Sequence, residues 1–256
     1  MQAFTLAALA AASASAQFST LMITEDSKVA TKYYRTDDSK EVGSVGFVIP
    51  VDNFVSLKND DLAGTSTFYM PNMVGGAIEY DLNLSSVGCG CVAGLYAVNV
   101  SNQCNSELNI EIDSPQCASI DLMQANVAGF QTQMHPCANG TCDAVSQCSY
   151  TMAKEGEAKY GAGAYGRNGS LIDTKDTFRV RTEFVSKNSY KNLWKVRTRL
   201  TQGENEMLVE ADCTDYIDSM TSKLDGSMAL TASTWKSSGR DAQLANFEDS
   251  EQCESQ

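Results

Sequence analysis

Apolar and polar residues alternate along several stretches of this chain, the pattern of half-buried β-strands. The alternation is clearest over residues 77–84, 178–184 and 190–202. In the last of these, strict alternation groups Leu193 with the charged Lys195 and places Trp194 with the apolar Val196. Residues 215–223 are the one helix candidate, and they end at a turn. The pattern therefore predicts a chain built mostly of strands.

The polar positions of the last two runs are strongly basic. They form a predicted basic sheet face from Arg179, Arg181, Lys195, Arg197 and Arg199. The whole chain of 256 residues is nonetheless acidic, with a net charge of -13. Such an acidic balance argues against nucleic acid and anionic membranes as partners. The basic face is either a solvated surface or a docking site for an acidic protein or polysaccharide.

The first 16 residues have the features of a secretory signal peptide. A short apolar run from Phe4 to Ala12 precedes Ala14-Ser15-Ala16, a cleavage site before Gln17. The run is too short to span a bilayer. Nine cysteines fit an oxidising compartment. We therefore expect a secreted protein without a membrane anchor, with one domain over residues 17–256.

Residues 117–126, Cys-Ala-Ser-Ile-Asp-Leu-Met-Gln-Ala-Asn, carry the strongest motif. Polar side chains stand at Ser119, Asp121 and Gln124. A two-residue step puts Ser119 and Asp121 on one face of a strand, and Gln124 reaches that face only across a kink or bulge. The run resembles the active-site strand of glycoside hydrolase family 7, Cys-Ser-Glu-Met-Asp-Ile-Trp-Glu-Ala-Asn. The resemblance places Ser119 at the nucleophile, Asp121 at the residue that orients it, and Gln124 at the acid/base.

Further motifs extend the resemblance over about residues 65–253. The run 89–96 resembles Cys-Gly-Leu-Asn-Gly-Ala-Leu-Tyr of that family, and Met134-His135-Pro136-Cys137 resembles Pro-His-Pro-Cys. The implied ligand-binding residues are Tyr96, Gln103, His135 and Trp235. Each also has a structural interpretation: a packed strand aromatic for Tyr96 and Trp235, and a capped loop residue for His135. The family's long loops are trimmed here, which predicts an open cleft.

The resemblance also implies a disulfide framework. It pairs Cys89 with Cys253, Cys104 with Cys117, Cys137 with Cys142, and Cys148 with Cys213. Cys91 is left over, either buried and inert or linked to another chain. Asn-x-Ser/Thr triplets predict glycosylation at Asn83, Asn99, Asn139 and Asn168.

These features lead to an expected fold and three functional hypotheses. The resemblance implies an all-β, concanavalin-like jelly-roll β-sandwich of two curved antiparallel sheets. Retaining glycosidases need two carboxyls about 5 Å apart, and neither Ser119 nor Gln124 is an acid. We therefore expect a secreted, catalytically inactive relative that binds β-glucan or cellulose-like glycan, or that has a structural role in an extracellular coat.

The first alternative is an active β-1,4-glucan hydrolase that uses relocated acids, with Glu111, Asp113 and Asp121 as candidates. The second is a protein-interaction module that uses the basic face. His135 is the sole histidine and has no ligand pair at zinc spacing, so we expect no metal and no cofactor.

Overall fold

The computed structural model describes two groups of residues. Side chains are described over 71–88, 90–99, 118–135, 150, 156–187, 192–210, 217, 220–222, 224 and 228–235. Elsewhere it describes only the backbone of strands. Within the described part of the chain, no helix combines the length and the apolar character that a bilayer crossing requires.

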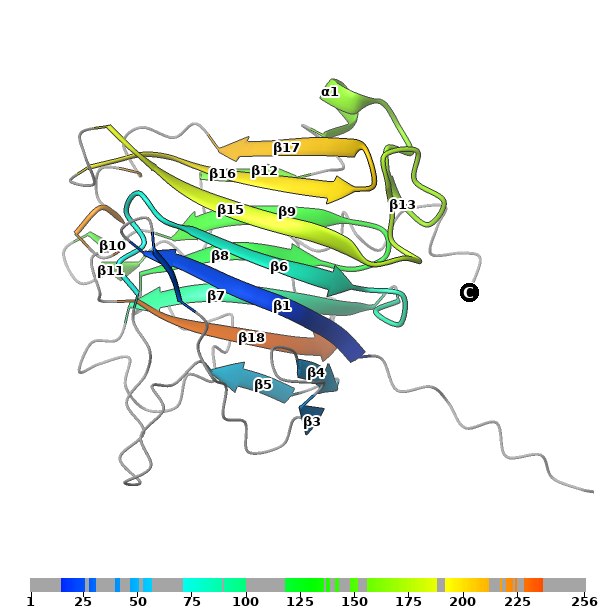
Figure 1. The fold of residues 1–256 in the computed structure, drawn as a ribbon, viewed down its shortest axis with the longest axis horizontal. Coiled ribbons are helices and arrows are strands. Elements are labelled where there is room, and N and C mark those ends of the chain that lie inside the picture. The colour runs from blue at the N-terminus through cyan, green and yellow to red at the C-terminus, as the bar shows by residue number, and fades with distance from the viewer. Residues whose placement is uncertain are drawn as a thin grey trace, which may run out of the picture.

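Two large sheets form the molecule, one in front of the other in Figure 1. The eight-stranded sheet runs in the order β17 (Asn205–Ala211), β16 (Leu193–Gln202), β15 (Phe178–Ser186), β6 (Ala77–Asn83), β1 (Ser15–Glu25), β4 (Phe47–Pro50) and β3 (Lys40–Glu41), with β2 (Lys28–Ala30) beside β1. The six-stranded sheet runs in the order β12 (Cys148–Thr151), β9 (Phe130–His135), β8 (Ser119–Ala125), β7 (Cys91–Asn99), β18 (Met228–Lys236) and β5 (Asn53–Ser56). All strand pairs in both sheets are antiparallel. The expected all-β sandwich is confirmed.

Three small elements complete the part of the fold that the structure describes. The pair β10 (Cys137–Ala138) and β11 (Thr141–Cys142) forms a hairpin in which the two cysteines are directly opposed. Opposed Cα atoms of antiparallel strands lie within the range that a disulfide spans. The parallel pair β13 (Tyr165–Gly166) and β14 (Ile172–Asp173) follows the short helix α1 (Glu157–Tyr160).

Apolar side chains from both sheets meet between the layers. Tyr80 and Phe184 from the larger sheet and Met123 and Phe130 from the smaller one are fully buried. The Tyr80 hydroxyl donates to the Met123 sulfur across the layers at 3.6 Å, and burial raises the pKa of Tyr80. Fully burying one such side chain contributes roughly 1.5–3 kcal/mol, so this inter-sheet core dominates the stability of the sandwich.

The predicted basic face of β15 and β16 is not basic in the structure. Each of its cations contacts a carboxylate: Arg179 contacts Asp81 and Glu79, Arg181 contacts Glu79 and Glu183, Lys195 contacts Glu210, Arg197 contacts Glu210 and Glu183, and Arg199 contacts Glu206. Most of these acids come from β6 and β17, which flank the two basic strands. The expectation was wrong because the neighbouring strands supply the opposite charges. This finding removes the basis for a docking module that uses the face.

The strict alternation expected over residues 190–202 also fails at one end. The register of β15 and β16 shifts between Val185 and Ser186, which leaves Trp194 as an extra residue on β16. A bulge of this kind reverses the facing of the residues beyond it. Leu193 is consequently buried, and Trp194 is 48% exposed with the Lys195 ammonium over its ring.

The amino-terminal strand was not anticipated. Strand β1 begins at Ser15, two residues before the expected cleavage point. From Gln17 onward its backbone pairs with β6 on one side, and Gln17 and Phe18 pair with β4 on the other. A chain cleaved before Gln17 would therefore retain most of this strand.

Candidate functional site

A bulge in β8 sorts the side chains of the central strand between two faces. Asp121 pairs with Gln133 and Gln124 pairs with Gln131, so two β8 residues oppose one residue of β9. Ile120, Leu122 and Met123 are buried in the inter-sheet core. The bulge places Ser119, Asp121 and Gln124 together on the opposite side, which we call the outer face of the six-stranded sheet.

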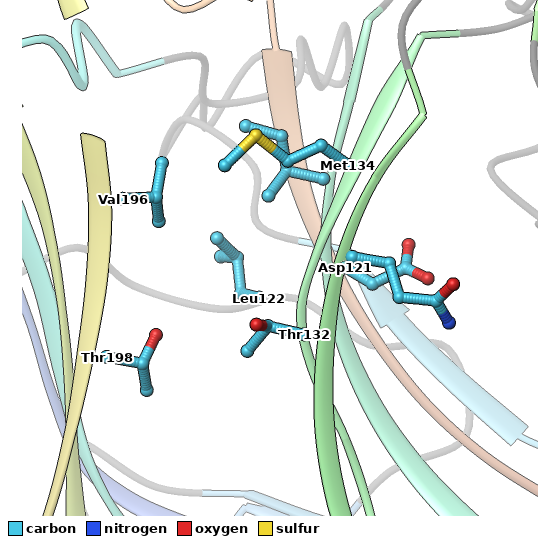
Figure 2. Close-up of a pocket in the computed structure, with 8 residues that line it drawn as sticks. Asp121, Leu122, Thr132, Met134, Val196 and Thr198 are labelled. Atoms are coloured by element: carbon cyan, nitrogen blue, oxygen red, sulfur yellow. The ribbon is translucent and has the colours of Figure 1, made fainter. Parts of the chain in front are cut away.

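Figure 2 shows this separation directly. The Asp121 side chain projects from β8 away from Leu122, Thr132 and Met134, which point towards Val196 and Thr198 of the other sheet. An inter-sheet cavity of about 10 Å³ is lined by Leu122, Thr132, Met134, Val196 and Thr198, together with Ile120, Asp121 and Gln133. That is room for about one water molecule and far below the roughly 300 Å³ of a small ligand pocket. The outer face, and not this cavity, is therefore the candidate site.

A continuous polar network lies on the outer face. The Asp121 Oδ2 atom accepts from Gln124 Nε2 at 2.9 Å and lies 3.1 Å from His135 Nε2. The Gln124 Oε1 atom accepts from Gln131 Nε2 at 2.5 Å and from Gln133 Nε2 at 3.3 Å. The network therefore joins one carboxylate, three amides and one imidazole from two adjacent strands.

Two members of this network, Gln131 and Gln133, were missed from sequence. Both alternate with His135 along β9 and therefore share its face. They are 2% and 4% exposed, and each donates to Gln124. The signal was present in the run Phe-Gln-Thr-Gln-Met-His, where two polar amides precede the single histidine with a period of two.

The orientation of the Gln124 amide follows from its partners. Its oxygen faces two amide donors, and its nitrogen faces a carboxylate. Both ends of the buried amide are thus satisfied, as buried polar groups require. A neutral amide fully engaged in this way has no proton to transfer at any ordinary pH, so it cannot act as a general acid.

Asp121 is the one carboxylic acid within the bounds of the six strands of this sheet. Retaining hydrolysis needs two carboxyls about 5 Å apart, and inverting hydrolysis needs two that lie roughly 6.5–9.5 Å apart. Glu111 and Asp113, the candidates for relocated acids, lie outside the described residues. The outer-face strands therefore supply a single carboxyl. Within the described part of the chain, no three potential metal ligands gather together.

Aromatic residues border the network on the side of β7 and β18. The Tyr96 ring lies over Gly94, where an added Cβ would meet the Tyr96 hydroxyl at 2.1 Å. The Tyr96 and Trp235 ring centroids are 6.1 Å apart at an interplanar angle of 39°. Tyr96 is 2% exposed and is thus a packed strand tyrosine, whereas Trp235 is partly exposed. Gln103, the fourth expected binding residue, lies outside the described residues.

Exposure across this face differs from the open cleft that the shortened loops predicted. Asp121, Gln124 and both β9 glutamines are at most 5% exposed. Ser119 and Trp235 are partly exposed, and the His135 side chain is 14% exposed. Among the described side chains, access to the network is therefore from the Ser119 and His135 end and from Trp235.

The predicted disulfides and glycosylation sites remain predictions. The side chains of Cys89, Cys104, Cys117, Cys137, Cys142, Cys148, Cys213 and Cys253 all lie outside the described residues. Cys91 packs against the core and is partly buried. Of the four glycosylation candidates, Asn168 is exposed, Asn83 and Asn99 are partly buried, and Asn139 lies outside the described residues.

Comparison with known proteins bears on the fold. No family model and no curated protein sequence matches the chain. Its structure matches the native endocellulase I of Humicola insolens at a TM-score of 0.55 and 15% identity, over 73% of this chain and 66% of that one. It matches endoglucanase I complexed with cellobiose at 0.56 and 16%, over 82% and 69% of the two chains.

A family 7 (GH7) cellobiohydrolase from Daphnia pulex matches at a TM-score of 0.57 and 14% identity, over 86% of this chain and 72% of that one. At such low identities the likeness establishes the fold alone. This chain spans between 66% and 72% of the length of these three structures. The chain therefore has the antiparallel β-sandwich jelly-roll fold of the family 7 glycoside hydrolases.

Proposed function

We propose that this protein is a secreted, glycosidase-like protein that binds a β-1,4-glucan or a similar glycan on the outer face of its six-stranded sheet without cleaving it. The single observation that carries the proposal is the fully bonded amide of Gln124 beside the lone carboxylate Asp121. The fold is that of cellulases, and one of the matching structures contains cellobiose. That likeness supports a polysaccharide partner.

Loss of cleavage follows from the chemistry of the outer face. Glycosidic bond hydrolysis needs one group to protonate the leaving oxygen and a second to attack the sugar or activate water. Gln124 has no proton to give, and Ser119 has no second carboxyl beside it on the strands of this sheet. A bound glycan would therefore stay intact.

Glycan binding rests on the partly exposed end of the face. Trp235 offers an aromatic surface of the kind on which sugar rings stack, and the Tyr96 ring packs beside it. Ser119 and His135 add polar groups with partial exposure. Secretion rests on the signal-like residues 1–16 and on the nine cysteines.

A paired assay on insoluble cellulose tests both halves of the proposal. The native protein should co-sediment with cellulose and release no reducing sugar. Trp235→Ala should weaken binding about 2- to 12-fold, the equivalent of one aromatic contact of about 0.5–1.5 kcal/mol. Trp194→Ala is the matched control, because that tryptophan is 48% exposed on the other sheet and should leave binding unchanged.

Two results would contradict the proposal. Release of reducing sugar by the native protein would mean that acids outside the described residues catalyse hydrolysis. Equal loss of binding in Trp235→Ala and Trp194→Ala, or no binding at all, would remove the glycan site. A Ser119→Glu/Gln124→Glu double variant serves as the positive control for turnover, since it restores a carboxyl at each of the two positions.

A further inference from the structure

We propose that Asn168 carries an N-linked oligosaccharide, attached through its side-chain amide nitrogen. The proposal rests on the secretion part of the proposed function and not on glycan binding or loss of cleavage. Asn168-Gly169-Ser170 has the order of residues that the transfer reaction requires. The same order occurs at three other places in the chain, so the motif alone does not single out this one.

Asn168 lies at the tip of a tight turn. The Gly169 N–H donates to the Gly166 carbonyl at 2.9 Å, which closes a β-turn with Asn168 in its third position. The φ of Asn168 is 58°, in the left-handed region where asparagine is enriched among non-glycine residues. Asn168 and Ser170 are both exposed. The turn therefore presents the acceptor amide and the hydroxyl of the motif to solvent together.

The hydrogen bonds of Asn168 involve its backbone and its side-chain oxygen. The Asn168 N–H donates to Asp173 Oδ1 at 3.0 Å, and Lys175 Nζ donates to Asn168 Oδ1. An ammonium group has no acceptor capacity and therefore pairs with the oxygen end of an amide. Within the described part of the chain, Asn168 Nδ2 donates to no protein atom. The atom to which the sugar would be joined is thus the end of the amide that the fold does not use.

The loop that carries Asn168 is anchored to both sheets. The Tyr165 hydroxyl donates to the Asn126 carbonyl at 3.1 Å, and Gln202 of β16 receives the Asp173 N–H at 2.7 Å and donates to the Asp173 carbonyl at 2.9 Å. The loop therefore has a fixed place at the end of the sandwich where β13 is labelled in Figure 1. Asn126 directly follows β8, so the oligosaccharide would be attached at the opposite end of that strand from Ser119.

The amide of Asn83, another candidate from the sequence, is used differently. Its Oδ1 atom accepts from the Ser85 N–H at 3.0 Å and from the Ser85 hydroxyl at 2.7 Å. Its Nδ2 atom donates to Thr177 Oγ1 at 3.4 Å, and the residue is partly buried. In the folded protein a sugar on that nitrogen would have to share the space beside Thr177. Asn168 is therefore the better supported of these two acceptors.

The transfer conserves atoms and charge. Asn168 Nδ2 bonds to the anomeric carbon of a lipid-linked oligosaccharide, the donor class that eukaryotic secretory compartments supply. The bond from that carbon to the pyrophosphate oxygen breaks, one proton leaves Nδ2, and the lipid pyrophosphate is released. The product remains an amide with its oxygen in place, so the contact from Lys175 Nζ to Asn168 Oδ1 is kept.

Translation of the full-length chain in vitro with endoplasmic-reticulum microsomes tests the proposal. Protease-protected protein is digested with peptide N-glycosidase in heavy-oxygen water, which converts a glycosylated asparagine to labelled aspartate. Peptide mass spectrometry should find this label at position 168 and should not find it in an undigested sample. The second measurement excludes spontaneous deamidation of Asn168 next to Gly169.

Ser170→Ala removes the hydroxyl of the motif and should abolish the label at position 168 completely. Ser170→Thr is the matched control, because it keeps a hydroxyl and should keep the label. Ser170 is exposed, and its backbone N–H, which donates to the Gly163 carbonyl, is present in both variants. Neither change therefore disturbs the loop.

Each outcome supports or overturns the proposal. It is overturned if protease-protected native protein has no label at position 168, or if Ser170→Ala is labelled there as fully as the native protein. A chain that the microsomes do not take up would contradict secretion and this inference together. A chain that is taken up but unmodified at Asn168 would contradict this inference alone.

Discussion

Replacing Gln124 with Glu is the most direct probe of the outer-face network. In the native protein Gln124 Nε2 donates to Asp121 Oδ2 at 2.9 Å. The substitution puts a carboxyl oxygen where that nitrogen lies. Two ionised carboxylates about 3 Å apart repel each other by roughly 5 kcal/mol at an effective dielectric constant of about 20. A proton shared between them removes this repulsion.

The magnitudes decide which state forms at neutral pH. Holding a proton at pH 7 on a glutamate whose ordinary pKa is about 4.3 costs roughly 3.7 kcal/mol. That is less than the repulsion of roughly 5 kcal/mol, so the folded variant should keep one proton on the pair at pH 7. The unfolded variant loses it near pH 4.3. The folded state therefore binds more protons than the unfolded state between these limits.

The sign of the pH dependence follows from this difference. Because the raised pKa belongs to the folded state, the variant should lose stability relative to the native protein as the pH rises. The difference in free energy of unfolding should change by up to about 1.4 kcal/mol per pH unit between roughly pH 5 and 7. Urea unfolding from pH 4.5 to 8 measures it. Gln124→Met is the control, since it loses the same hydrogen bonds without a titrating group. A constant difference between Gln124→Glu and native protein across this range would refute the network geometry.

Two further predictions concern other parts of the sandwich. Burial favours the neutral form of Glu210, but hydrogen bonds and charge from Lys195 and Arg197 outweigh it and lower the pKa of Glu210. Lys195→Met should therefore reduce stability by up to about 1 kcal/mol at pH 7. Urea unfolding should show this difference disappearing as the pH falls through the folded-state pKa of Glu210. A difference that persists at pH 2.5 would contradict the ion pair. Gly94→Ala should destabilise the fold by about 1–3 kcal/mol because the new Cβ meets the Tyr96 ring. Tyr96→Leu should recover part of the loss in thermal unfolding, and full additivity of the two changes would show that the ring does not lie over Gly94.

Local patterning was sufficient to predict much of the fold. The expected strand over 77–84 is β6 (Ala77–Asn83), and the strand expected from Phe178 is β15 (Phe178–Ser186). Both have one apolar side facing the other sheet and one charged side facing water, so their periodicity is an unbroken two. Where a bulge interrupts the period, as at Trp194, the same reasoning assigned the wrong face.

The predicted site illustrates the same limit. Strict alternation puts Ser119 and Asp121 on one face and Gln124 on the other, and only the resemblance, with a bulge in the strand, placed all three together. The register shift in β8 has that effect. The donors to Gln124 come from β9, and the carboxylates beside Arg179 and Arg181 come from β6. Which strand lies beside which is a property of topology, so single-strand reasoning missed both sets of partners.

The sequence by itself determined that the chain is rich in strands and that positions 119 and 124 carry a hydroxyl and an amide. Both properties depend only on residues that are neighbours along the chain. Only the tertiary structure decided that the basic strands are neutralised by their neighbours, that the outer face is largely buried, and that His135 contacts Asp121. The physical reason is that hydrogen-bonded register joins residues distant in the chain, and a shift of one residue exchanges the two faces of a sheet.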